Sequence, residues 1–223
     1  MTDQRPKTSR RADTMPRSRT IAALLFALIA TMAVGAVGGA QEASPEASPA
    51  PTEGAAAVIA SPIGDPRPAP ELVGLVYPDL TPFDLADLQG SPILLYFGYT
   101  HCPDVCPATL GELFGVWEEA PDMQAVYVTV DPERDTPEFL AEWTRYLPEN
   151  LHALTGSPGA IRRAAENFGV RYARVETTST SGYTMSHTAE LYLIDKHGQL
   201  LLSYPFGTPA AEIAADIAVL QAD

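Results

Sequence analysis

Cysteine is scarce in this chain of 223 residues, which contains only two. Small domains that depend on disulfides instead of a large core need several cysteine pairs, so two cysteines exclude that class of protein. Cys102 and Cys106 lie four positions apart. A close pair of this kind favours metal binding or thiol redox chemistry over a structural role.

Basic residues are also few, with 14 Lys and Arg against 28 Asp and Glu, a formal net charge of -14. A nucleic-acid-binding protein needs a basic face to neutralise phosphates, so we expect no nucleic-acid partner. Residues 1–40 contain six of the basic residues and two acids, which leaves a net charge of -18 on the remainder. A hydrophobic content of 46% is typical of a chain with a globular core.

A single long run of apolar and small residues without a charge extends from Ile21 to Ala40. Twenty such residues can span a bilayer, and the basic residues before them predict a cytoplasmic N-terminus over 1–20. We therefore expect a transmembrane anchor over 21–40, with the rest of the chain on the extracytoplasmic (periplasmic) side. The alternative is a signal peptide, cleaved near the small residues Gly38, Gly39 and Ala40, which would give a secreted form.

The stretch from Gln41 to about Pro70 is rich in Ala, Ser, Pro and Glu. Because this composition cannot bury a core, it predicts an extended, mobile tether. We place the disordered linker at 41–64 and the globular domain at 65–223.

Hydrophobic patterns and helix caps predict a mixed α/β domain. Ile93–Tyr99 and Ala125–Val130 are apolar at consecutive positions, as expected of buried strands. Thr136-Pro137 and Ser157-Pro158 are typical helix starts. Further strands are expected at 72–77, 189–195 and 200–203, further helices at 107–117 and 209–220, and a polar loop at 176–186. This order predicts a thioredoxin-like fold, with a mixed central sheet flanked by helices.

Both cysteines lie where the strand at 93–99 gives way to a helix. Pro107 has no backbone N–H and so belongs in the first helical turn, which makes Asp104 the expected N-cap. Free N–H groups and the helix dipole at this position should favour the thiolate form of cysteine and lower its pKa. Two thiolates suit Cu(I) and make an incomplete zinc site, but the spacing alone does not separate copper binding from dithiol redox chemistry.

A third metal ligand has to come from another part of the chain, and His187, just before the strand at 189–195, is the best candidate among the four histidines. His152 and His197 are expected to be structural, and His101 at most supports the site from beside Cys102. Met185 could supply a soft ligand, but we expect it to be a loop contact. Asp131 could lie near the site, but we expect it to be a turn residue before Pro132.

Four segments together resemble the Sco/SenC family: YFGYTHCPDVCPATL (96–110), VTVDPERDTPEFL (128–140), LTGSPGAIRRAAENFGV (154–170) and SHTAELYLID (186–195). The resemblance implies a thioredoxin fold, a single membrane anchor, and copper bound by Cys102, Cys106 and His187. The family commonly has Asp before this histidine, where the present chain has Ser186.

The resemblance also implies a function. Family members act as copper chaperones for the binuclear copper site of cytochrome c oxidase subunit II, so we expect this subunit or another copper protein as the partner. The alternative is a thiol-disulfide oxidoreductase, in which Cys102 and Cys106 are a redox pair that forms a disulfide when oxidised. A peroxidase is disfavoured, because peroxiredoxins have Thr three residues before the reactive Cys, where Tyr99 and Pro103 stand here.

Overall fold

The computed structural model describes residues 60–178 and 182–222. The predicted N-terminal segment, the membrane span and the linker as far as residue 59 lie outside the described residues. None of the helices in the described part is both long and apolar enough to cross a membrane.

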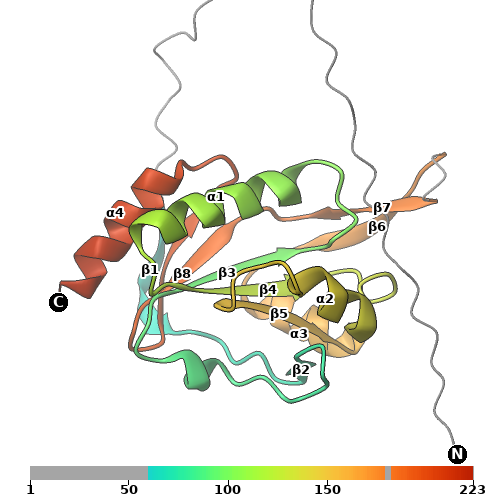
Figure 1. The fold of residues 1–223 in the computed structure, drawn as a ribbon, viewed down its shortest axis with the longest axis horizontal. Helices are drawn as coiled ribbons and strands as arrows, with labels where there is room; N and C mark the ends of the chain where they lie inside the picture. The colour runs from blue at the N-terminus through green and yellow to red at the C-terminus, as the bar shows by residue number, and fades with distance from the viewer. Residues whose placement is uncertain (1–59, 179–181, 223) are drawn as a thin grey trace, which may run out of the picture. The chain divides into compact units, whose positions relative to one another are not determined.

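A mixed sheet forms the centre of the domain (Figure 1). Its seven strands, among the described residues, follow the order β1-β9-β8-β3-β4-β5-β2, and β6 and β7 form a separate two-stranded sheet. The strands are β1 (Ser61–Pro68), β2 (Leu75–Val76), β3 (Ile93–Gly98), β4 (Gln124–Thr129), β5 (Leu151–Gly156), β6 (Tyr172–Glu176), β7 (Tyr183–His187), β8 (Leu191–Ile194) and β9 (Gln199–Tyr204).

The middle of the sheet is parallel and its flanks are antiparallel. β3 pairs parallel with β4, and β4 pairs parallel with β5. β8 pairs antiparallel with both β3 and β9. Every residue of β3 is buried, as the continuous apolar pattern predicts for a strand covered on both faces.

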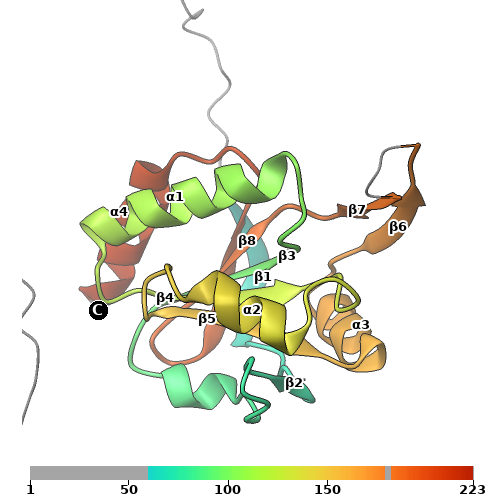
Figure 2. The same ribbon diagram turned by 45° about the vertical axis from the view of Figure 1, so that its right-hand side comes forward.

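Helices cover both faces of the sheet. The structure has α1 (Val105–Glu119), α2 (Pro137–Thr144), α3 (Pro158–Asn167), α4 (Ala210–Gln221) and a short 3-10 helix η1 (Leu85–Leu88). Figures 1 and 2 show α1 and α4 together on one face, with α2 and α3 on the other. The mixed sheet with flanking helices that the sequence predicts is confirmed.

The caps predicted for α2 and α3 are confirmed. Thr136 and Ser157 each accept a hydrogen bond from the backbone N–H three residues later, and a proline follows each of them. Gly169, just beyond α3, has a φ of 74°, a conformation that glycine adopts without strain. These local signals fix where both helices begin and where α3 ends.

Four strands differ from the sequence prediction. β1 begins at Ser61, inside the stretch assigned to the linker, and pairs antiparallel with β9. β5 had not been expected, and the predicted polar loop at 176–186 instead contains the end of β6 and most of β7. The side chains of β1, β6 and β7 are mostly exposed or half-buried, so these strands have no clear apolar pattern and depend on backbone pairing.

Candidate metal centre

Three elements bring the predicted ligands together. Cys102 lies in the turn between β3 and α1, Cys106 in the first turn of α1, and His187 at the end of β7. Their ligand atoms all lie within 4.8 Å of one another. The Sγ atom of Cys106 is 3.3 Å from Nε2 of His187. The structure thus gathers all three candidates at one end of the central strand.

His187 is oriented by a backbone contact on the other side of its ring. Its Nδ1 lies 3.0 Å from the carbonyl oxygen of Thr188, which can only accept a hydrogen bond. Nδ1 therefore has the proton and donates it, so Nε2 faces Cys106 with a free electron pair. Burial lowers the pKa of His187, which further favours this neutral, ligating form.

Aromatic rings surround the imidazole. Tyr96 and Tyr99, both in or beside β3, meet the His187 ring edge-to-face at centroid distances of 6.0 and 5.8 Å. Both tyrosines are almost fully buried. Neither tyrosine was predicted to contact the site, and the one signal for it in the sequence is their place in or beside a buried strand next to the cysteine motif.

The two thiols differ in environment. Although burial raises the pKa of Cys102, hydrogen bonds from the Cys106 thiol and from the backbone N–H groups of Asp104 and Cys106 outweigh it, so the pKa is lowered. Burial instead raises the pKa of Cys106 to about 12. The lowered thiol pKa that the helix start predicts is therefore found at Cys102 and not at Cys106.

The start of α1 also differs from expectation. Asp104 occupies the N-cap position, but its side chain makes no capping hydrogen bond. The Sγ atom of Cys102 accepts a hydrogen bond from the backbone N–H of Cys106 at 3.4 Å. The sulfur thus accepts a hydrogen bond from one of the free N–H groups at the helix start, a role that a capping side chain would otherwise have. Both thiols are free, so no disulfide joins them in this structure.

The other histidines do not join the cluster of ligands. His101 packs against Phe139 and hydrogen bonds to Thr100, with its Nδ1 3.4 Å from buried Asp135. His152 contacts the side chains of Gln124 and Tyr77, and exposed His197 lies in the turn between β8 and β9. The polar contacts of His152 agree with the structural role expected for it, and His197 lies in the expected hairpin turn.

Asp131 and Met185 lie outside the cluster as well. Asp131 forms a turn, as predicted, because its carbonyl accepts from the backbone N–H groups of Arg134 and Asp135. Its carboxylate is buried and contacts Arg134 and Tyr183. Half-buried Met185 lines a cavity of about 260 Å³ together with Asp131 and Tyr183.

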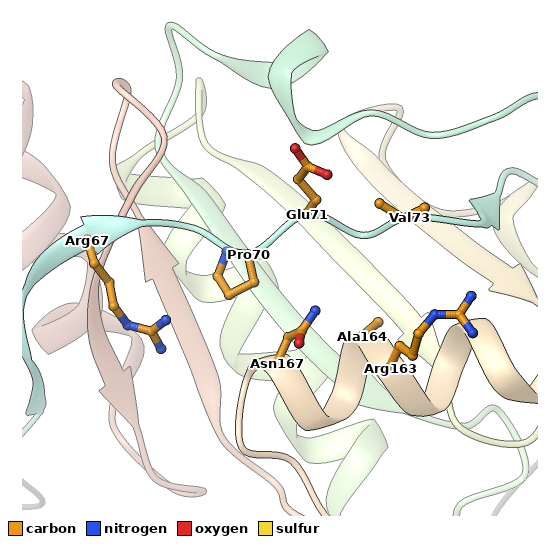
Figure 3. Close-up of a pocket in the computed structure, with 7 residues that line it drawn as sticks. All are labelled: Arg67, Pro70, Glu71, Val73, Arg163, Ala164 and Asn167. Carbon is orange, nitrogen blue, oxygen red and sulfur yellow. The ribbon is translucent and has the colours of Figure 1, made fainter.

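A second cavity, of about 530 Å³, lies between the segment 67–73 and α3 (Figure 3). Arg67 and Arg163 lie toward opposite ends of it, with Asn167 between them. The two guanidinium groups therefore do not converge on one ligand. None of the three candidate metal ligands lines this cavity.

Comparisons with known proteins agree with the geometry. A model of the SCO1/SenC family matches residues 75–222. An SCO2-like protein of Rickettsia prowazekii is 35% identical over 147 residues, which cover 59% of this chain and 72% of that protein. The human mitochondrial SCO1 homologue is also 35% identical, over 138 residues, but the match spans only 46% of its length and 59% of this chain.

A solved structure gives the same result for the fold. The copper-bound structure of ScoI from Bradyrhizobium japonicum is 32% identical and superimposes with a TM-score of 0.60, covering 69% of this chain and 99% of that one. This likeness confirms the predicted thioredoxin-like fold. Because the family model covers most of the chain and includes both cysteines and the histidine, the chain belongs to the SCO1/SenC family.

Proposed function

We propose that this protein binds copper through Cys102, Cys106 and His187 and delivers it during the assembly of cytochrome c oxidase. The observation that supports the proposal most strongly is the convergence of these three ligand atoms within 4.8 Å. Two thiol sulfurs and an imidazole nitrogen suit copper, with the sulfurs favouring Cu(I). A structural zinc site would normally take a fourth protein ligand, and no further His, Cys, Asp or Glu joins this group among the described residues.

The environment of the site supports metal transfer. The cluster lies where a loop, a helix start and a hairpin end meet, so each ligand comes from a different segment. Cys102 has the lowered thiol pKa, and a thiolate is the form that binds metal. A partner with its own soft ligands could take the copper by ligand exchange, and the family resemblance favours the binuclear copper site of oxidase subunit II as the acceptor.

The test combines stoichiometry with ligand spectroscopy. The reduced full chain is loaded with Cu(I) without oxygen, and X-ray absorption reports the donor atoms around the metal. We expect one copper per chain with two sulfur donors and one nitrogen donor. A site with sulfur donors alone would contradict the assignment of His187. Transfer of the copper to an isolated subunit II copper domain then tests delivery.

A thiol-disulfide oxidoreductase is the second candidate, and the difference between the two thiols favours it. The Cys102 thiolate would attack a partner disulfide and form a mixed disulfide, with the partner's other sulfur leaving as a thiolate. Cys106 would then attack the Cys102 sulfur, which releases the reduced partner and leaves a Cys102–Cys106 disulfide. A His187→Ala strain that keeps normal oxidase assembly, while either cysteine variant loses it, would favour this role.

We also propose that residues 21–40 anchor the domain to a membrane, with the domain on the extracytoplasmic side. The proposal rests on the apolar run and on the basic residues before it. Membrane fractions washed at high pH should retain the chain. N-terminal sequencing that begins near residue 41 would show cleavage instead and contradict the anchor.

A further inference from the structure

The hairpin β6–β7, which supplies His187, lies outside the seven-stranded sheet. Its two strands pair with each other and with no other strand among the described residues. Figures 1 and 2 both show it extending beyond the central sheet. Since β-sheet pairing does not attach the hairpin to the core, other contacts must set the position of His187 relative to the cysteines.

The turn after β4 provides such contacts. The carboxylate of Asp131, which is 3% exposed, accepts hydrogen bonds from Nε of Arg134 and, at 2.9 Å, from the hydroxyl of Tyr183. Nη1 of Arg134 also donates to the carbonyl oxygen of Tyr183 at 3.1 Å. Both the side chain and the backbone of Tyr183, the first residue of β7, are therefore bound to this turn.

Cation–π stacking on the Tyr183 ring adds to the contact between this turn and β7. The guanidinium of Arg134 lies 3.8 Å from the centre of the Tyr183 ring, and the guanidinium of Arg174 lies at the same distance. The Arg134 side chain is 17% exposed, whereas that of Arg174 is 47% exposed. Cation–π contacts are stronger when the cation is desolvated, so Arg134 should contribute more than Arg174.

The guanidinium of Arg134 also connects the turn after β4 to the residues around the candidate ligands. It lies 5.6 Å from the centre of the Tyr99 ring, and the Tyr99 hydroxyl hydrogen bonds to Oγ1 of Thr184 at 2.6 Å. Tyr99 packs edge-to-face on His187, and its carbonyl accepts from the backbone N–H of Cys102. One buried residue thus contacts both halves of the candidate site, His187 through its ring and Cys102 through its backbone carbonyl.

We propose that Arg134 is a positioning residue for His187. Together with Asp131 and Tyr183 it forms an anchor, here named the Arg134 anchor, that fixes the β6–β7 hairpin so that the imidazole faces Cys106. This inference rests on the proposed copper site, because it assigns a role to residues that would not touch the metal. Outer partners that orient a ligand typically change metal affinity by about 10- to 100-fold when removed.

The test compares Arg134→Met with a matched control, Arg145→Met, in the reduced full chain. Arg145 lies at the end of α2, is 63% exposed and pairs with Glu142. Competition with a Cu(I)-specific chelator should give an affinity about tenfold weaker for Arg134→Met and unchanged for Arg145→Met. Arg134→Lys keeps the charge but loses the forked geometry of the guanidinium. Its copper affinity should lie between those of Arg134→Met and the wild type.

A metal-free measurement separates positioning from general stability. In Arg134→Met, amide hydrogen exchange should become faster in β6 and β7 but stay unchanged in β3 and β4. Tyr183→Phe, which loses only the hydroxyl bond to Asp131, should show the same pattern more weakly and serves if Arg134→Met folds poorly. Wild-type copper affinity together with wild-type exchange in the hairpin would overturn the proposal, as would faster exchange throughout the domain.

The two proposals can fail separately. If the wild-type chain binds no copper, the proposed function fails, but hydrogen exchange still shows whether the Arg134 anchor fixes the hairpin. If the wild type binds copper and Arg134→Met binds it equally well with an unchanged hairpin, only the positioning role fails.

Discussion

The Sγ atom of Cys106 and Nε2 of His187 lie 3.3 Å apart, although 81 positions separate them in the sequence. Cys106 is fixed by the first turn of α1, and His187 by a hairpin that the turn after β4 binds. The candidate site is therefore assembled from one rigid helix start and one segment attached by side-chain contacts. This division leads to different expectations for the two cysteines and for the histidine.

The two thiols should react at different rates. The pKa of Cys102 is lowered and that of Cys106 is raised to about 12, so near pH 8 Cys102 has the larger thiolate fraction. In the reduced, metal-free protein, iodoacetamide should modify Cys102 first, and the pH at which its rate rises should lie below that for Cys106. Peptide mass spectrometry after timed quenching measures both rates, and faster labelling of Cys106 would contradict the assignment.

Two glycines in α1 should respond oppositely to alanine. A Cβ at Gly115 would lie 2.8 Å from Cβ of Ala210 in α4, whereas a Cβ at Gly111 meets nothing within 4 Å. Gly115→Ala should lower the free energy of unfolding by about 1–3 kcal/mol because it overpacks the α1–α4 contact. Gly111→Ala should raise it by about 0.5–1 kcal/mol through helix propensity. Urea unfolding measures both, and equal effects would refute the contact between these helices.

Strand β1 should stabilise the domain although its side chains are mostly exposed. A chain that starts at residue 69 lacks the pairing with β9 and leaves that strand as an edge. We expect it to be less stable than a chain that starts at residue 59, by on the order of 2 kcal/mol from the lost backbone hydrogen bonds. Equal melting temperatures for the two fragments would show that residues 61–68 belong functionally to the linker.

His152 should contribute to acid sensitivity. Burial lowers the pKa of its imidazole below 6.5, so the unfolded chain takes up a proton at a higher pH than the folded one. The stability that His152 contributes is present above pH 6.5 and is lost as the pH falls through the folded-state pKa. Between pH 7 and pH 5, His152→Gln should lose less free energy of unfolding than the wild type. Urea unfolding at each pH measures this, and an equal loss in both proteins would contradict it.

Elements with local signals could be predicted from the sequence. β3 and β4 are continuous apolar runs, and α2 and α3 begin at a hydroxyl cap followed by proline. Strands β1, β6 and β7 could not be predicted, because backbone pairing with a partner forms them and their side chains show no pattern that repeats every two residues.

The candidate site also has features that could be predicted from the sequence and features that could not. The spacing of Cys102 and Cys106 predicts a close pair, because the helix start places them one turn apart. His187 could be favoured from its position but depended on the family resemblance, since nothing local links residue 187 to residue 106. The raised pKa of Cys106 could not be predicted either, because it results from burial under side chains distant in the sequence.

The copper affinity of His187→Ala shows whether the histidine is a metal ligand. In the reduced full chain, competition with a Cu(I) chelator compares this variant with the wild type and with His197→Ala, whose histidine lies in an exposed hairpin turn. We predict that His187→Ala binds copper at least about tenfold more weakly, a loss of about 1.4 kcal/mol, while His197→Ala binds like the wild type. Equal affinity of His187→Ala and the wild type would contradict the three-ligand site.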